Sequence, residues 1–480
     1  MILPRSVIKR LGLRMLPFSD AASDQLPMPR LLRLSLFQVS CGMAMVLMLG
    51  TLNRVMIVEL GLAASIVAVM VALPILIAPI RTILGHRSDT HRSAIGWKRV
   101  PYIWFGSLWQ MGGLAVMPFA LLVLSGQQQV GPEWAGEALA ALAFLMTGLG
   151  MHMTQTAGLA LAADLATEET RPRVVALLYV MFLAGMAVSA VIIGALLRDF
   201  SSLRLVQVVQ GAALMTLLLN LVSLWKQERL APMSRAERAE PKQPLREAWA
   251  DLSRDTGIVR LLTVVVLGTM ALSMQDVLLE PYGGEILSLS VSATTLLTAM
   301  WAGGALVGFW LAGRWLRIGL NVHRISANGL LIGIVALAAV VFAAPLDSAA
   351  LFFAGAGGIG LGTGLFGVAT LIAAMTMPVS GKAGRGLVLG AWGAAQATAA
   401  GLAVAAGGGL RDVIGSAASS GLLGTALNQP STGYSFVYHL EIGLCFAALV
   451  AIGPLVRHTH SFDATSARNS NGIGLAEFPT

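Results

Sequence analysis

Long apolar runs separated by short polar stretches make up most of the chain. Twelve such runs lie at roughly 34–52, 62–80, 102–124, 138–163, 174–197, 205–225, 259–279, 292–312, 326–344, 351–373, 387–408 and 437–456. An α-helix needs roughly 20 apolar residues to cross the hydrocarbon core of a bilayer, and most of these runs approach or exceed that length. Because backbone polar groups in lipid must be satisfied within the protein, the pattern predicts an all-α polytopic membrane protein with twelve transmembrane helices.

The composition agrees with this prediction. Of the 480 residues, 56% are hydrophobic and only 12% are charged, which is about half of the charged share usual in soluble domains. The first apolar run begins after about thirty mostly polar and basic residues and is too long for the core of a signal peptide, so we expect no cleavable signal. Cys41 and Cys445 both lie inside apolar runs, which favours two small buried side chains over a disulfide.

The distribution of positive charge predicts the topology. The net charge is +8, yet all but four of the 32 Lys and Arg residues fall in the termini and in the loops on the same side as the termini. The opposite loops contain only Arg54, Arg198, Arg204 and Arg411. Such a bias is typical of cytoplasmic loops, so we expect both termini in the cytoplasm. The basic loops would then face anionic membrane lipids, and we expect no nucleic-acid partner.

A long charged connection divides the twelve runs into six plus six. Two six-helix halves joined in this way are typical of transporters whose halves are related by an axis along the membrane normal, and of the major-facilitator-like fold in particular. The first 18 residues mix basic and apolar side chains, which fits either a short helix on the inner membrane surface or a disordered basic tail. We therefore predict a cytoplasmic N-terminal segment (1–33), an N-terminal bundle (34–225), a cytoplasmic linker (226–258), a C-terminal bundle (259–456) and a disordered cytoplasmic tail (457–480).

The loop after the second run reads GHRSDTHRSAIGWKRVP. Its Gly85, Asp89 and Arg92 resemble the loop signature of the major facilitator superfamily, in which glycine allows close packing and aspartate caps a helix and pairs with arginines. The alternative to a signature is an ordinary basic loop on the inner side of the membrane. The equivalent loop of the second half keeps Gly313 but has Arg317 where an aspartate is expected, so any latch formed by these loops is asymmetric.

His152 lies near the middle of the fourth run and is the strongest candidate for ligand chemistry. Gln155 follows three residues later, so the two side chains share a helix face. Asp164 ends the run about 18 Å further along the helix, which places the imidazole near the midplane of the bilayer. A neutral imidazole at that depth could bind a metal, bind the magnesium of a chlorin or relay protons. A histidine hydrogen-bonded inside the bundle explains the same position, and both interpretations stay open.

A second polar group is expected near the outer membrane interface. Arg54 and Glu59 follow the first run, and Asp276 and Glu280 lie near the end of the seventh, in MQDVLLEPYGGE. Arg54 needs a carboxylate partner, and either Glu59 or Glu280 could supply it. We expect Pro281 to end the seventh helix, which makes Asp276 and Glu280 too shallow for a midplane proton site and favours an outer ion pair. A contact with a ligand or a partner protein is the functional alternative.

Glycine and the remaining polar residues point to packing rather than catalysis. The stretch GAGGIGLGTGLFG at 355–367 contains a G-x-G-x-x-G spacing, but no strand precedes it and it lies inside an apolar run. We therefore expect close helix packing there, not a nucleotide site. No metal-ligand spacing or nucleophile motif lies in a suitable context. We expect no enzymatic activity and no bound metal ion of the protein's own.

Several segments together resemble one family within the superfamily. They are LPFSDAASDQLPMPRLLRLSLFQVS, TLNRVMIVELG, RSDTHRSAIGWKRVPYIW, ADLATEETRPRVVALLYVM and MQDVLLEPYGGE. These segments are similar to the PucC/LhaA proteins, the bacteriochlorophyll-delivery branch of the major facilitator superfamily in purple phototrophic bacteria. The resemblance runs from about residue 16 to the last run, and within the family we expect the LhaA branch, which is linked to the core antenna.

The resemblance implies work in antenna assembly in the bacterial inner or intracytoplasmic membrane. Expected partners are the newly inserted antenna α and β polypeptides, chlorophyll synthase and the reaction centre, and the expected ligand is bacteriochlorophyll a, bound transiently. His152 and Gln155 are then candidate pigment-binding residues. Two other functions remain open: a proton-coupled, alternating-access transporter of a small solute, and a scaffold that binds antenna helices but no pigment. The shortage of ionisable residues expected near the midplane weakens the transporter.

Overall fold

The computed structural model describes residues 21–23, 26–78, 80, 97, 99–125, 132, 134–167, 170–228, 254–376 and 385–458. The loop signature formed by Gly85, Asp89 and Arg92 lies outside these residues, as do the first 20 residues with the expected surface helix. Most of the predicted linker and the tail from 459 onward are outside them too.

The described part of the chain is helical and contains no strand. Among the described residues, ten helices are long and apolar enough to cross a membrane, and α5 is a shorter apolar helix. With α17, which spans 35 residues, each of the twelve predicted runs contains a helix, so the all-α prediction is confirmed. In chain order the elements are α2 (Met28–Leu34), α3 (Leu36–Met45), η2 (Val46–Thr51), α4 (Leu52–Arg54), η3 (Val55–Glu59), α5 (Ala64–Leu76), α7 (Val100–Leu124), α8 (Ala135–Leu165), α9 (Arg171–Leu196), α10 (Ser202–Leu224), α12 (Thr256–Ser273), η4 (Met274–Val277), α13 (Leu279–Glu285), α14 (Val291–Arg317), α15 (Val322–Ala343), α16 (Ala349–Thr376), α17 (Arg385–Ser419), η5 (Thr425–Leu427) and α18 (Thr432–His458).

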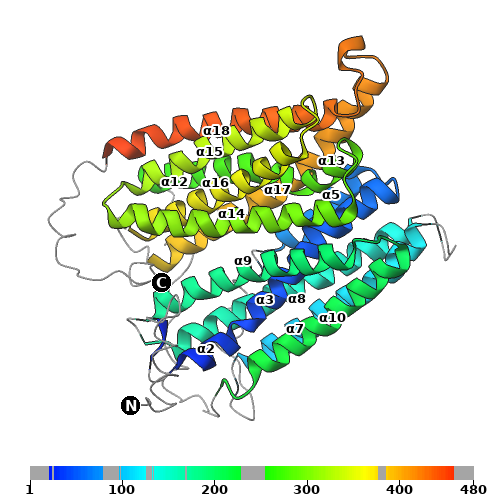
Figure 1. Cartoon of the computed structure of the whole chain (residues 1–480). Helices are drawn as coiled ribbons and strands as arrows, with labels where there is room; N and C mark the ends of the chain where they lie inside the picture. Colours follow the sequence, from blue (N-terminus) through cyan, green and yellow to red (C-terminus); the bar gives the residue numbers. More distant parts are fainter. Residues whose placement is uncertain are drawn as a thin grey trace, which may run out of the picture.

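The helices form two bundles that correspond to the two halves of the sequence (Figure 1). Within the halves, α7 packs along α8 and α15 packs along α16. Between the halves, the main contacts join α5 to α17 and α9 to α14. These are the second and eleventh, and the fifth and eighth, membrane helices, and exchanging the halves turns one pair into the other. The fold therefore has the pseudo-twofold arrangement expected from the sequence.

The first membrane helix begins earlier than predicted. Elements α2 to η3 form one apolar stretch of 32 residues, Met28–Glu59, so the boundary placed at residue 33 is wrong. Pro29 lies in the first turn of α2, where its missing N–H is not needed for helix hydrogen bonds. Leu31 and Leu34 are fully buried, which explains why the polar residues of this segment did not prevent it from joining the bundle.

Glycine lets helices approach closely in both halves, whereas the sequence predicted this only for the stretch 355–367 of the second half. A Cβ atom at Gly360 on α16 would collide with the backbone carbonyl of Trp301 on α14. On α8 of the other half, a Cβ atom at Gly150 would collide with the backbone of Gln110 on α7. Because each contact is with backbone, a larger residue at either position would force two helices apart.

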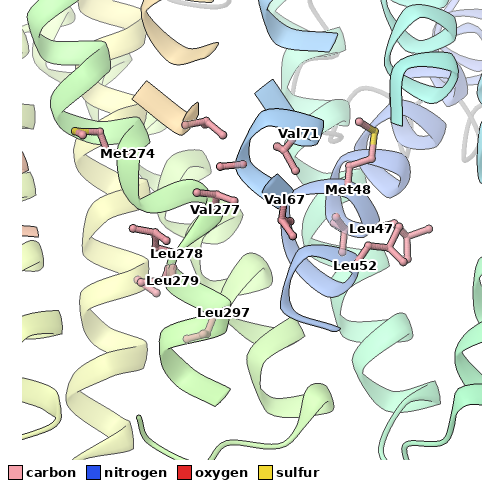
Figure 2. Packing of buried hydrophobic residues seen from close by; sticks show 14 of the residues in the cluster. Leu47, Met48, Leu52, Val67, Val71, Met274, Val277, Leu278, Leu279 and Leu297 are labelled. Carbon is pink, nitrogen blue, oxygen red and sulfur yellow. The ribbon is translucent and has the colours of Figure 1, made fainter. Parts of the chain in front are cut away.

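The halves are joined tightly at one end, which we call the far end because it is opposite the end where α2 begins and α18 ends, the terminus end. Figure 2 shows apolar side chains of the first helix and of α5, such as Leu47 and Val67, gathered beside Val277 and Leu297 of the other half. Polar contacts reinforce the same region: Thr51 Oγ1 lies 3.2 Å from Thr295 Oγ1. The far end is therefore a mixed apolar and polar seal.

Candidate functional site

A large cavity lies between the two halves. Its volume is about 1230 Å³, which exceeds the roughly 300–1,000 Å³ typical of pockets for drug-sized ligands. In the N-terminal half the wall is formed by α3, η2, α5, α8 and α9. In the C-terminal half it is formed by α12, η4, α13, α14, α16 and α17. Most lining residues are apolar, and methionines and aromatic rings are frequent among them.

The cavity extends toward the terminus end and is closed at the far end. Its lining includes Arg173 in the first turn of α9 and Leu316 in the last turn of α14. At or near the far end, hydrogen bonds join described residues of the two halves. They are Thr51–Thr295, Asn53–Val277, Arg54–Leu289, Ser65–Asp412 and Ser292–Gly194. This is the arrangement of a two-bundle membrane protein that is accessible from one side only.

The wall of the N-terminal half carries His152 and Gln155, as the helix register predicted. His152 is 5% exposed, and its Nε2 lies 2.7 Å from the backbone carbonyl oxygen of Pro74, in the last turn of α5. Gln155 donates from Nε2 to Oε1 of Gln38, at 3.3 Å. His152 therefore combines both properties that the sequence left open: it lines the cavity and it is hydrogen-bonded inside the bundle.

The wall of the C-terminal half carries Asp276 and Glu280, contrary to the sequence-based prediction. The seventh membrane helix does not end at Pro281, because α13 includes that residue in its first turn, where proline is tolerated. The helical stretch continues to Glu285, so Asp276 lies about 13 Å inside its end at the helical rise. Glu280 is 3% exposed, and its Oε1 accepts a hydrogen bond from Thr298 Oγ1 at 2.5 Å.

The sequence allowed two carboxylate partners for Arg54, and the structure confirms Glu59 rather than Glu280. Arg54 pairs with Glu59 at 2.5 Å and donates a second hydrogen bond to the carbonyl oxygen of Leu289, at 3.1 Å. The alternative ion pair of Arg54 with Asp276 or Glu280 is not formed among the described residues. Asp276 accepts a hydrogen bond from Gln275. The four residues predicted as one outer cluster therefore form two groups, because the seventh helix is longer than its apolar run: Arg54 and Glu59 belong to the far-end seal, and Asp276 and Glu280 to the cavity.

At a break in the seventh helix, the backbone is hydrogen-bonded to a carboxylate that was not predicted from the sequence. Between α12 and α13 the chain passes through the short 3₁₀ segment η4, which leaves backbone N–H groups without helical partners. Glu441 on α18 is fully buried and accepts the backbone N–H of Gln275, at 2.9 Å. Its signal in the sequence was available, since Glu441 is the one acidic residue within the twelfth apolar run.

A second missed group closes the far end. Arg411 on α17 pairs with Glu285 at 2.5 Å and with Asp412 at 2.9 Å. Asp412 also accepts the backbone N–H of Ser65, at 2.6 Å, in the first turn of α5. A carboxylate from one half thus caps a helix of the other, a favourable place for negative charge. The sequence analysis noted Arg411 but gave it no partner.

Comparison with solved structures places this architecture in a known class. A bacterial homologue of the human lysosomal transporter Spinster, in an inward-facing conformation, superposes with a TM-score of 0.67 and 14% identity, over 92% of this chain and 98% of that one. The nucleoside transporter NupG gives a TM-score of 0.62 with 14% identity, over 89% of this chain and 100% of that one. The protein is therefore a multi-pass membrane protein with the fold of the major facilitator superfamily.

The sequence comparisons identify the family. The profile of the family described as "PUCC protein" matches residues 51–460, and the chain belongs to this family. An uncharacterised protein of the puhA–bchM intergenic region of Rhodobacter capsulatus is 62% identical over the full length of both chains. Protein PucC of Rhodovulum sulfidophilum is 52% identical over 85% of this chain and 90% of the relative. The bacteriochlorophyll synthase 44.5 kDa chain of R. capsulatus is 30% identical over 80% of this chain and 88% of the relative.

Proposed function

We propose that the protein is an assembly factor for the purple-bacterial light-harvesting antenna, and that it holds bacteriochlorophyll a in the central cavity before delivery to newly inserted antenna α and β polypeptides. The observation that carries the proposal is the cavity itself: it is large, mainly apolar, closed at one end and built into a PucC-family chain. Antenna polypeptides, chlorophyll synthase and the reaction centre are the proposed partners. The protein itself has no enzymatic role in this proposal.

The lining residues fit a large planar amphiphile. Aromatic side chains, among them Tyr179, Trp310 and Trp392, line the cavity toward the terminus end. They offer flat apolar surfaces for a macrocycle. Deeper polar groups, namely His152, Gln155 and Glu280, offer a few directed contacts. A mainly apolar pocket with a small number of placed polar groups is the usual form of a site for such ligands.

We further propose that this chain serves the core antenna, as LhaA proteins do. The support is the pattern of identities. The relative from the puhA–bchM region is 62% identical over the whole chain, whereas the PucC proteins are 48% to 52% identical over shorter stretches. In this proposal the protein lies in the inner or intracytoplasmic membrane with both termini in the cytoplasm, so the cavity faces the cytoplasmic side.

One observation favours a second candidate, the proton-coupled transporter. Asp276 and Glu280 line the cavity, which removes the argument that the protein has no suitably placed carboxylates. Ionisable residues inside a membrane protein frequently mark proton pathways. A transporter must open the far end in each cycle, whereas a factor that loads and unloads from one side does not. Whether the far-end seal must open therefore distinguishes the two functions.

A cross-link across the seal tests this difference. The Thr51→Cys/Thr295→Cys pair replaces hydroxyl groups that lie 3.2 Å apart on opposite halves, and the native Cys41 and Cys445 are buried and form no disulfide. After oxidation, we expect antenna complexes to form at the wild-type level in a strain that depends on this protein. The single Thr51→Cys variant is the control. Loss of antenna on cross-linking, restored by reductant, would support alternating access instead.

The partners are tested by purification. Tagged protein extracted in mild detergent should bring down antenna polypeptides and chlorophyll synthase, identified by mass spectrometry. An unrelated tagged protein with the same fold provides the background. If neither partner is enriched over that background, the assembly proposal fails.

A further inference from the structure

The C-terminal wall of the cavity contains three buried side-chain polar atoms that have no hydrogen-bond partner among the described residues: Oε2 of Glu280, Nε1 of Trp301 and Oε1 of Gln275. The amide of Gln275 is already held through its nitrogen by Leu272 and Asp276. This leaves Glu280 and Trp301 as the pair that can meet a ligand. Both residues line the cavity. A buried polar group without a partner costs free energy, and in native proteins such a group calls for a specific explanation. A ligand in the cavity that pairs with both atoms would provide it.

The two atoms are held on one small framework. Thr298 Oγ1 donates to Oε1 of Glu280 at 2.5 Å, so one carboxylate oxygen is fixed while the other keeps its lone pairs. Trp301 follows Thr298 by three residues on α14, which places the two on the same helix face. Gly50 on the opposite half leaves the space for this carboxylate, because a Cβ atom there would collide with Glu280.

No ion pair joins Glu280 to another described residue, although Arg54 is close enough to attract its carboxylate electrostatically. Arg54, the basic residue of this region, is bonded to Glu59 and to the carbonyl of Leu289, and its guanidinium packs against Gly284. The fixed oxygen and the unpaired oxygen make Glu280 a preformed oxygen ligand. Mg²⁺ prefers such hard oxygen ligands, and a hydrogen bond to the second oxygen orients a ligating carboxylate.

His152 is less suited to the same role. The carbonyl oxygen of Pro74 can only accept, so Nε2 of His152 must carry the proton in their 2.7 Å hydrogen bond. The protonated Nε2 has no lone pair for a metal, so only Nδ1 of the neutral ring could act as a ligand. The cavity-lining imidazole is thus engaged in holding α8 to the end of α5, and it offers at most one ring nitrogen rather than two for contact with a ligand.

We propose that Glu280 supplies the axial ligand to the magnesium of the tetrapyrrole, and that Trp301 donates a hydrogen bond to a carbonyl group on the rim of the same macrocycle. This inference rests on the proposed function and specifies the binding site within it. The C-terminal wall then recognises the metal and the rim together, and the N-terminal wall, with His152 and Gln155, supplies shape and additional contacts.

The test compares two pigments that differ only at the centre. Bacteriochlorophyll a contains magnesium, and bacteriopheophytin a has two protons in its place. The purified full-length protein in mild detergent is titrated with each pigment, and the ratio of the two dissociation constants measures how much the metal contributes. We expect the wild type to prefer bacteriochlorophyll a by about tenfold or more, the scale at which metal-ligand shells affect affinity.

Glu280→Gln should bring the ratio close to one and leave the affinity for bacteriopheophytin a unchanged. Glutamine keeps a carbonyl oxygen for Thr298 but places an amide nitrogen, which has no available lone pair, where Oε2 was. Glu59→Gln is the matched control, because it makes the same substitution in the far-end seal, away from the cavity. This variant should keep the wild-type ratio. Size-exclusion profiles identical to the wild type confirm that each variant is folded.

Trp301→Phe should weaken the binding of both pigments equally, so the ratio of the two dissociation constants stays at the wild-type value. The infrared carbonyl stretch of the bound pigment should also move to the frequency of a carbonyl without a hydrogen bond. His152→Ala should keep the preference for magnesium. If Glu280→Gln retains the wild-type ratio, or if His152→Ala abolishes it, the assignment is wrong. If the wild type binds neither pigment, the proposed function itself fails and the assignment fails with it.

Discussion

The first helix of the N-terminal half and the first helix of the C-terminal half both depart from ideal α geometry in the region of the cavity and the far-end seal, but in opposite ways. The former widens into π-helical segments at Val46–Thr51 and Val55–Glu59, and the latter tightens into the 3₁₀ segment Met274–Val277. The wide turns leave a notch at Gly50 that accommodates Glu280. The tight turn leaves backbone N–H groups that Glu441 accepts.

The comparison shows how two halves with one topology divide their tasks. The polar groups of the N-terminal wall, such as His152 and Gln155, are bonded within their own half. The C-terminal wall carries the acidic groups and the unpaired atoms. Local departures from regular helix, rather than the overall fold, therefore create the asymmetry, as is common at sites inside membrane helices.

The close packing shared by both halves should be the most sensitive feature. Gly360→Ala pushes a methyl group into the carbonyl of Trp301, and we expect a loss of about 3 kcal/mol of stability, the upper part of the usual range for overpacking. Gly367→Ala on the same helix is the control, since a Cβ atom there meets nothing within 4 Å. Thermal unfolding in detergent measures both. Equal melting temperatures for the two variants would contradict the packing described for α14 and α16.

The helix break should depend on the carboxylate from α18. Glu441→Leu removes the acceptor for the backbone N–H of Gln275, and an unsatisfied buried N–H costs roughly 1–3 kcal/mol. Glu441→Gln keeps a carbonyl oxygen and should recover most of the loss. His439→Gln, exposed on the same helix, should not change the melting temperature. The role assigned to Glu441 is wrong if the leucine and glutamine variants are equally stable.

The imidazole on the other wall should matter less for stability. His152→Ala removes one hydrogen bond to the carbonyl of Pro74, which is worth about 1 kcal/mol. It also removes a contact to the ligand, so we expect pigment content to fall in the purified protein. Pigment absorption per mole of protein, measured beside the melting temperature, checks both effects. Unchanged pigment content would remove His152 from the proposed binding site.

The ion pair at the rim should have the smallest effect. Glu59 is 38% exposed at its side chain, and pairs that are partly in contact with solvent contribute about 0–1 kcal/mol. Glu59→Gln should therefore shift the melting temperature only slightly, and less at high salt. Arg54→Gln should cost more, because Arg54 is 4% exposed and also bonds Leu289. A larger loss for Glu59→Gln than for Arg54→Gln would reverse this interpretation.

The sequence predicted the architecture well, because the apolar runs and the glycine pattern are direct consequences of membrane insertion and helix packing. It also predicted that His152 and Gln155 share one face of their helix, since helix register alone determines that spacing, and both line the cavity. It failed for Asp276 and Glu280, because a proline after a polar pair normally ends a helix, and here α13 restarts just before Pro281. The pairing of Arg54 with Glu59 rather than Glu280 could not be chosen from sequence either, because it depends on the π turns of the first helix.

We propose above all that this chain holds bacteriochlorophyll in the cavity between its halves. The most direct measurement is the near-infrared absorption spectrum of the tagged protein, purified in mild detergent from cells that make bacteriochlorophyll. Trp301→Phe and Glu280→Gln variants purified in parallel link any pigment to the cavity. We predict a bacteriochlorophyll band in the wild type that decreases in both variants. A colourless wild-type protein, or a band of equal strength in all three, would contradict the claim.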